Sequence, residues 1–216
     1  MKDLSRKFLY ESERQRIMER VKKAETLTSG EIVPLIVSSS FNYPMANVLG
    51  GALFGFFLAL ILTPVVGRQL WLGPSNMWLF IGFFVSSFIV CYILVKMVPW
   101  LKRVFISKTE MESEVNEAAI TAFYREGLNK TRDETGILIF ISVFEHKVCV
   151  LADKGINNKV HEGQWDEIVA MIIDGIKKKR QADAICEAIE KVALLLREHF
   201  PIRPDDRDEL ENLIVK

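Results

Sequence analysis

The sequence lacks a surplus of either charge. It has 28 Lys and Arg residues against 28 Asp and Glu residues, so its formal net charge is zero. Because binding to nucleic-acid phosphates requires a basic surplus, the composition argues against a DNA or RNA partner. Glycine and proline are also sparse, at 12 and 7 of 216 residues, while half of the residues are hydrophobic. These values exclude collagen-like, low-complexity and disordered chains.

Cysteine and histidine are equally scarce. Cys91, Cys149 and Cys186 show no CxxC or metal-ligand spacing, so we expect three buried thiols in a reducing compartment and no disulfide framework. The three histidines at positions 146, 161 and 199 are isolated from one another in the sequence, and we assign none of them a ligand role.

Several catalytic motifs are missing from the sequence. It contains no P-loop and no HExxH, no arginine follows Cys149 at the spacing of a cysteine phosphatase, and Asp153 lacks the second aspartate of an aspartyl-phosphate enzyme. If the chain hydrolyses phosphate esters, the remaining route is a metal-activated water held by carboxylates.

The most prominent feature of the sequence is a pair of long uncharged stretches. Residues 45–67 and 76–95 contain no charged side chain, and as helices they would be about 34 Å and about 30 Å long, enough to cross a hydrocarbon core. The connector, residues 68–75, is short, so the pair is predicted to form a transmembrane hairpin. The first stretch begins too far into the chain for a cleavable signal peptide.

The basic residues predict the orientation of this hairpin. Lys96, Lys102, Arg103 and Lys108 follow the second stretch, whereas the connector contains only Arg68. By the positive-inside rule we expect a two-pass protein of the cell (inner) membrane with both termini cytoplasmic. The lipid bilayer is therefore a predicted partner.

Small residues recur at four-residue spacing in both stretches. Gly51 and Gly55 lie in the first, and Gly82 and Ser86 lie in the second. Such pairs let helix backbones approach closely. We favour packing within the hairpin over the alternative of a homo-oligomer seam.

The hydrophilic parts, residues 1–44 and 104–216, are predicted to form one domain interrupted by the hairpin at 45–95. In the first part, apolar residues at helical spacing up to Leu27 predict a helix, with Gly30 placed for a left-handed cap. A β-branched run then predicts a strand over residues 31–40. Pro34 cannot donate a ladder hydrogen bond, so we expect this strand at an edge or with a bulge.

The second part alternates helical and extended patterns. A capping box at Ser107 and Glu110 opens a helix that we expect to reach about Leu128. Residues 136–153 predict two strands joined near residues 145–147, the first of them central in the sheet. Two further helices follow, one opening at Trp165 and one ending before Pro201. This order predicts an α/β fold in which the N-terminal strand joins the same sheet.

Several of these segments resemble the TPM domain family. They are TSGEIVPLIV at residues 28–37, TGILIFISVFEHKVCVLADKGI at 135–156, the following Trp165 helix, HFP at 199–201 and DEL at 208–210. The resemblance implies a Rossmann-like α/β/α sandwich with a small sheet. It also implies two activities found in some members, acid phosphatase and calcium binding at acidic residues on one sheet edge. Many relatives are exported, and this chain differs from them by its two apolar stretches.

Acidic residues near strand ends are the candidate metal ligands. Asp153 is the strongest, because open α/β sheets bind ligands where strands end. Glu31 precedes the first strand and could complete a site with it. The acidic run near the C-terminus would suit Ca²⁺ or Mg²⁺, and its members are Asp205, Asp206, Asp208 and Glu209. The alternatives are a turn aspartate at 153 and a solvated, helix-starting run at 205–209.

These observations favour a membrane-anchored TPM-like protein that is non-catalytic and has a divalent-cation site. It would act as an accessory, quality-control or stress factor for another membrane protein. The alternative is a metal-dependent acid phosphatase, so the question of enzymatic activity stays open. A third possibility is a purely structural membrane protein. The basic run at residues 177–180 is either a solvated helix end or a contact for lipid headgroups.

Overall fold

The computed structural model describes residues 4–73, 75–202 and 210–216, apart from the side chain of residue 162. The chain forms two compact units. One contains residues 42–111, and the other combines the residues up to 41 with residues 112–216. We describe each unit separately.

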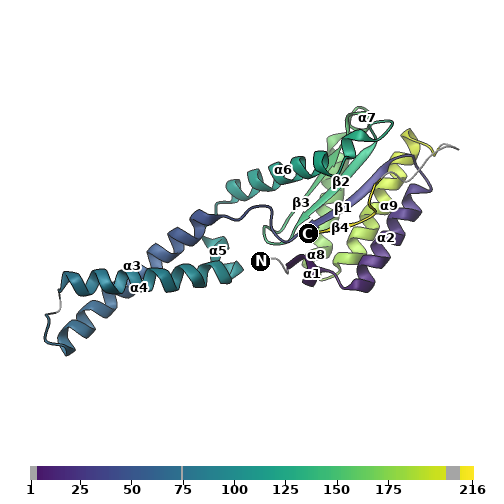
Figure 1. The fold of residues 1–216 in the computed structure, drawn as a ribbon. Coiled ribbons are helices and arrows are strands. Elements are labelled where there is room, and N and C mark those ends of the chain that lie inside the picture. Colours follow the sequence, from purple (N-terminus) through teal and green to yellow (C-terminus); the bar gives the residue numbers. More distant parts are fainter. Residues whose placement is uncertain (1–3, 74, 203–209) are drawn as a thin grey trace. The chain divides into compact units, whose positions relative to one another are not determined.

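The second unit contains a four-stranded sheet (Figure 1). Its strands are β1 (Glu31–Val37), β2 (Gly136–Ser142), β3 (Lys147–Ala152) and β4 (Ile214–Val215), in the order β3-β2-β1-β4. β1 runs parallel to both β2 and β4, and β3 is antiparallel to β2. The N-terminal strand therefore belongs to the same sheet as the strands that follow the apolar stretches.

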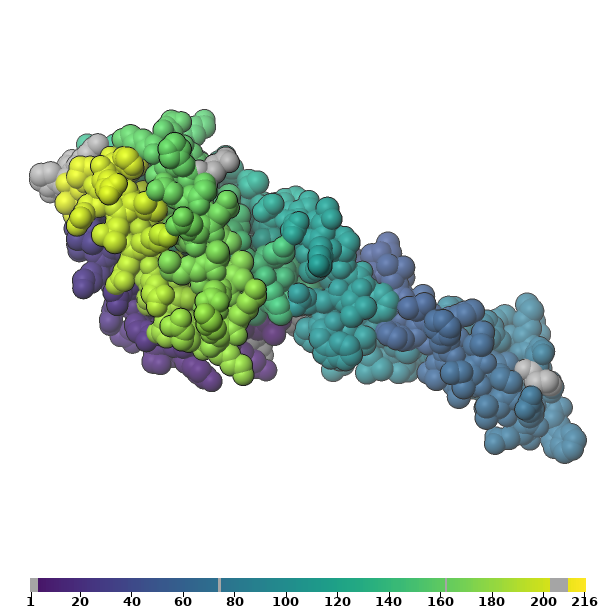
Figure 2. Space-filling view, turned by 180° about the vertical axis from the view of Figure 1, so that it is seen from behind, coloured from purple at the N-terminus to yellow at the C-terminus, as the bar shows by residue number. Residues whose placement is uncertain are grey.

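β2 is central because it is apolar on both faces. All seven of its residues are buried. Ile137, Ile139 and Ile141 pack into one core with α2 (Glu11–Glu25), α8 (Glu162–Lys177) and α9 (Gln181–His199). Leu138 and Phe140 pack into a second core with α6 (Lys108–Arg125). Helices thus cover both faces, which confirms the predicted α/β/α architecture. Figure 2, seen from behind, shows α8 and α9 on one of these faces.

The long elements are found where the sequence predicts them, but α6 (Lys108–Arg125) stops short of Leu128, α8 (Glu162–Lys177) begins ahead of Trp165, and β1 (Glu31–Val37) is shorter than the predicted 31–40. α6 starts after Ser107, whose Oγ accepts a hydrogen bond from the backbone N–H of Glu110 at 3.1 Å. α9 ends at His199, ahead of Pro201. Among the described residues, four short helices were not predicted: α1 (Leu4–Phe8), α5 (Pro99–Val104), η1 (Leu128–Lys130) and α7 (Lys154–Asn157).

The end of α2 differs from the prediction. The helix stops at Glu25, so Leu27 lies outside it and is 39% exposed. Gly30 is not a left-handed cap. A Cβ built on Gly30 would lie 2.5 Å from Cδ1 of Leu196, so this glycine instead lets the start of β1 approach α9 closely.

The position of β1 is a second correction. Pro34 led us to expect an edge strand or a bulge, yet β1 lies between β2 and β4. The N–H of Glu31 points to Thr135 beside β2, whereas the carbonyl of Ile36 accepts from Lys216 beside β4. By this alternation Pro34 faces the β4 side. β4 pairs only with Leu35 and Ile36, so the missing N–H of Pro34 falls where β1 has no β4 partner.

The first unit is a helical hairpin. It contains α3 (Pro44–Gln69), α4 (Met77–Met97) and the short α5 (Pro99–Val104). Along α3, every fourth residue is small or short and buried: Asn47, Gly51, Gly55, Ala59, Thr63 and Gly67. The buried residues of α4 are Ser87, Cys91 and Val95. This seam lets the two helices approach closely, while their large apolar side chains face outward.

The four predicted packing residues lie in different places. Cβ atoms built on Gly51 and Gly55 would lie 3.1 Å from Cβ of Tyr92 and 2.9 Å from the backbone nitrogen of Phe88. These two glycines are therefore at the α3–α4 seam. Gly82 has no described atom within 4 Å of its Cβ position, and Ser86 donates to the Gly82 carbonyl at 2.9 Å. This second pair lies outside the seam.

Candidate functional site

Asp153 lies where β3 passes into α7. Its backbone N–H donates to the carbonyl of Gly136 at 2.9 Å, and its Oδ1 accepts from the N–H of Lys154 at 2.7 Å. Its other carboxylate oxygen, Oδ2, is buried and has no hydrogen-bond partner among the described residues. A buried acceptor without a hydrogen-bond donor is unfavourable unless a cation or a water molecule satisfies it.

Asp153 lies at the opposite edge of the sheet from the one we expected. β3 is antiparallel to β2, with Ala152 opposite Ile137. The end of β3 therefore lies beside the beginnings of β1 and β2, where Glu31 pairs with Gly136. The carboxyl ends of the parallel strands, where open α/β sheets usually bind ligands, are at the other edge.

Glu31 shares this edge with Asp153. It opens β1 and is 6% exposed. β2 separates β1 from β3, so the two backbones are about 10 Å apart at the usual strand spacing. The structure thus places both predicted ligands on one edge, but on strands that are not neighbours.

The loop before β2 brings further oxygen atoms to this edge. A Cβ built on Gly155 would lie 2.8 Å from the carbonyl oxygen of Asp133 and 2.7 Å from that of Glu134. Only glycine fits against this loop, in which Glu134 adopts a φ of +55°. These carbonyls could not be predicted from the sequence, because any residue can supply one.

The described residues suit a cation that keeps part of its water shell better than a cation surrounded entirely by protein ligands. Among them, no group of three or more His, Cys, Asp or Glu side chains is arranged to hold a metal. The unsatisfied Asp153 oxygen and nearby backbone carbonyls are hard oxygen donors of the kind that Mg²⁺ and Ca²⁺ prefer, and Mg²⁺ usually keeps several waters. The other predicted ligands, Asp205, Asp206, Asp208 and Glu209, lie outside the described residues.

The cysteines outside the hairpin are not activated nucleophiles. Burial raises the pKa of the Cys149 thiol and that of the Cys186 thiol. Both are therefore protonated at neutral pH. Cys186 is buried as expected, whereas Cys149 is only half-buried.

The histidines occupy three separate elements. His146 lies in the β2–β3 turn, His161 precedes α8 and His199 ends α9.

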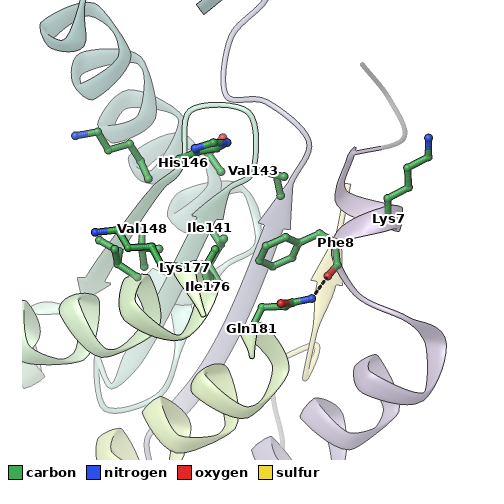
Figure 3. Close-up of a pocket in the computed structure, with 12 residues that line it drawn as sticks. Lys7, Phe8, Ile141, Val143, His146, Val148, Ile176, Lys177 and Gln181 are labelled. Atoms are coloured by element: carbon green, nitrogen blue, oxygen red, sulfur yellow. Dashed lines mark hydrogen bonds between the residues drawn. The ribbon is translucent and has the colours of Figure 1, made fainter. Parts of the chain in front are cut away.

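The sequence did not predict a pocket at the other edge of the sheet. This pocket has a volume of about 520 Å³ and lies beside the carboxyl end of β2 (Figure 3). Residues from α1, the β2–β3 hairpin, α8 and the start of α9 line it. These segments are far apart in the sequence, so no motif connects them.

Comparison with known proteins agrees with the architecture. Residues 102–194 match the family model described as TPM domain. No curated protein matches the chain. Among solved structures, the chain is similar to the NMR structure of the BA42 protein from the psychrophilic bacterium Bizionia argentinensis. The identity is 22%, the TM-score is 0.58, and the match covers 97% of this chain and 95% of that one. This likeness supports the fold, and residues 102–194 are similar to the TPM domain family model.

Proposed function

We propose that this chain is a membrane-anchored TPM-domain protein that serves as an accessory factor for another membrane protein. The supporting observation is the outward-facing apolar surface of α3 and α4. In their most apolar 18-residue windows, only 28% and 11% of the residues are buried. The core helix of a water-soluble domain would be mostly buried, so a lipid environment accounts better for this exposure.

The packing of the hairpin supports the same proposal. Small residues meet along the α3–α4 seam, and large ones such as Phe57, Ile61 and Ile93 face outward. Water-soluble helix pairs show the reverse pattern, with large apolar residues inside and polar ones outside. Membrane helices associate through small residues, because lipid tails are as apolar as leucine.

Membrane insertion can be tested with paired variants on the exposed face of α4. Val85 and Ile89 are 52% and 53% exposed. The full-length protein should stay in the membrane fraction after alkaline carbonate extraction, as should the control Val85→Ala/Ile89→Ala. Val85→Arg/Ile89→Arg should be released or degraded, because each arginine opposes insertion by about 3 kcal/mol. Recovery of the wild-type chain in the soluble fraction without detergent would contradict the proposal.

The accessory role can be tested by photo-crosslinking in intact membranes. A photoreactive amino acid at position 82, outside the hairpin seam, should form a reproducible adduct with one membrane protein. The same residue in place of Leu58, which is exposed on α3, is the control for random contact. Lipid adducts alone at both positions would argue against a dedicated membrane-protein partner.

We further propose that Asp153 anchors a weakly held divalent cation. Its unsatisfied oxygen supports this proposal. Titration of the full chain in nanodiscs with Ca²⁺ or Mg²⁺ should shift the backbone resonances of residues 153–155, and Asp153→Asn should abolish the shift. No response in the wild-type chain would refute the cation site.

An aryl phosphate assay distinguishes the alternative function. Metal-dependent turnover that disappears in a folded Asp153→Ala variant would support a phosphatase over an accessory role.

A further inference from the structure

We propose that the pocket beside the carboxyl end of β2 binds an amphipathic anion, with an aliphatic chain in the pocket and an acidic head at its rim. This site is at the opposite end of the strands from Asp153, so it is separate from the proposed cation site. Its volume of about 520 Å³ lies within the usual range for small-molecule sites.

The interior of the pocket is aliphatic. Figure 3 shows Phe8, Ile141, Val148 and Ile176 around the space between α1, the hairpin and α8. Of the apolar lining residues that are described, only Phe8 is aromatic, and the others are Ile141, Val143, Val148, Ile173 and Ile176. Branched aliphatic walls suit a flexible hydrocarbon chain better than a planar ring, which is usually held by stacking.

The rim carries positive charge. Lys7, Lys147 and Lys177 line the pocket, and none of the described lining residues is acidic. Lys147 pairs with Glu112 at 2.5 Å. In the part of the chain that is described, neither Lys7 nor Lys177 forms an ion pair. Figure 3 shows these two lysines on opposite sides of the pocket with their amino groups directed away from each other, so each adds positive charge at a different part of the rim.

The wall between α1 and α9 is held in place by a defined contact. Nε2 of Gln181, the first residue of α9, donates to the carbonyl oxygen of Phe8 at 3.0 Å (Figure 3). This hydrogen bond fixes the end of α1 against the pocket. A ligand therefore meets a preformed wall, and less ordering free energy opposes binding.

The head group is defined by charge and not by shape. A lysine ammonium is a compact point charge without the planar fork with which arginine selects carboxylates or phosphates. Fatty acids and acidic phospholipids share the required chemistry, an anionic head on an aliphatic chain. The experiment therefore separates a free ligand from one presented by the bilayer.

Binding can be measured by methyl NMR of the full chain in phosphatidylcholine nanodiscs. Dodecanoate should shift the labelled methyl groups of Ile141, Ile173 and Ile176, whereas the distant Ile189 and Ile214 should not move. Dodecanol is the matched uncharged probe and should give no saturable shift. Replacing part of the lipid with phosphatidylglycerol, without dodecanoate, reveals whether a bilayer lipid fills the pocket instead.

Matched variants test the role of the rim charges. Lys7→Gln/Lys177→Gln should weaken dodecanoate binding roughly 25-fold, at about fivefold for each exposed charge. Lys178→Gln should leave the affinity unchanged, because Lys178 is on the same helix end but does not line the pocket. The proposal is overturned if neither dodecanoate nor phosphatidylglycerol shifts the pocket methyls, or if dodecanol gives the same saturable shifts as dodecanoate. It is also overturned if Lys7→Gln/Lys177→Gln and Lys178→Gln bind dodecanoate with the same affinity.

Discussion

At the scale of single residues, Glu145 joins β1 to the β2–β3 turn. Its carboxylate is 1% exposed and accepts hydrogen bonds from Ser142 Oγ, from Ser39 Oγ at 3.1 Å and from the N–H of Ser40 at 3.0 Å. Because these hydrogen bonds connect the segment after β1 to the β2–β3 turn, this side chain should contribute substantially to stability.

Glu145→Ala should therefore lower the free energy of unfolding by about 3 kcal/mol, since it removes one hydrogen bond from the buried Ser142 hydroxyl and two from half-buried groups of Ser39 and Ser40. Chemical denaturation monitored by tryptophan fluorescence would measure the change. The control Glu187→Ala removes an exposed carboxylate 3.9 Å from Arg180 and should change stability by less than about 0.5 kcal/mol. Equal midpoints for the two variants would show that the Glu145 contacts are not stabilising.

Gly155 offers a second test at this scale. Gly155→Ala places a methyl group against the carbonyls of Asp133 and Glu134. It should destabilise the fold by about 1–3 kcal/mol, as overpacked sites do. Gly163→Ala is the matched control, because its Cβ meets no described atom within 4 Å. Thermal denaturation should show the control unchanged or stabilised, since alanine favours helix. If Gly155→Ala is as stable as the wild type, the loop moves to accommodate the methyl group.

Single residues also show where sequence reasoning succeeds and where it stops. Asp153 before Lys154 and Gly155 marks a strand end from local chemistry alone, and the structure has the strand end there. The predicted two-strand hairpin already makes β3 antiparallel to β2, so the end of β3 falls beside the start of β2, and the rule for the carboxyl ends of parallel strands does not apply to Asp153. Glu145 was assigned only to a turn, because two of its three donors, in Ser39 and Ser40 after β1, are more than 100 residues away in the sequence.

At the scale of elements, the α3–α4 seam depends on the small residues of α3. Gly55→Leu should separate the helices, because even a Cβ at this position lies 2.9 Å from the backbone of Phe88. Gly82→Leu should be tolerated, since Gly82 has open space around it. Thermal stability of both variants in nanodiscs, with spin labels on α3 and α4 to report their separation, would distinguish them. An unchanged separation in Gly55→Leu would contradict the seam.

The short strand β4 is held by a charge pair as well as by the sheet. Lys216 donates its backbone N–H to Ile36 at 2.8 Å, and its Nζ lies 2.6 Å from Oε1 of Glu126. Burial alone would raise the pKa of Glu126, but hydrogen bonds from Lys216 and Arg125 outweigh it and hold the pKa below its ordinary value. The ionised carboxylate is therefore favoured in the folded state.

This depressed pKa predicts a pH-dependent contribution to stability. The contribution is fully present above the unfolded-state pKa of glutamate, near 4.5, and is lost as the pH falls through the lower folded-state pKa. Wild type should be more stable than Glu126→Gln at pH 7, and the difference should shrink below about pH 4.5. Urea midpoints across pH 3–7 would measure it. In a Lys216→Gln background the difference should be smaller at every pH, and a pH-independent difference would contradict this account.

Long elements with a regular apolar pattern could be predicted from the sequence, whereas short elements could not. The apolar spacing of α8 and α9 and the uniformly apolar β2 each identify an element without tertiary information. β4 pairs through only two residues, too few to show a strand pattern. The central position of β1 was missed because Pro34 argues for an edge. Only the local absence of β4 beside Pro34 makes an interior position compatible with it.

At the scale of the whole molecule, the chain leaves the sheet after β1, forms the helical hairpin and returns to place β2 beside β1. Our central claim is that the residues before and after the hairpin fold into one unit on one aqueous side of a membrane. If α3 and α4 both cross the membrane, as we propose, they return the chain to the side from which it left. Two spans keep the residues before and after the hairpin on the same side, whereas a single span would place them on opposite sides.

Thiol labelling of single-cysteine variants in sealed vesicles tests this claim most directly. Cysteines replace Lys22 before the hairpin, Leu72 in its connector and Glu187 after it, all exposed positions, and the unsubstituted chain measures background from the native thiols. A membrane-impermeant maleimide should label positions 22 and 187 from the same side and position 72 only from the opposite side. Labelling of positions 22 and 187 from opposite sides, or of all three from one side, would contradict the account.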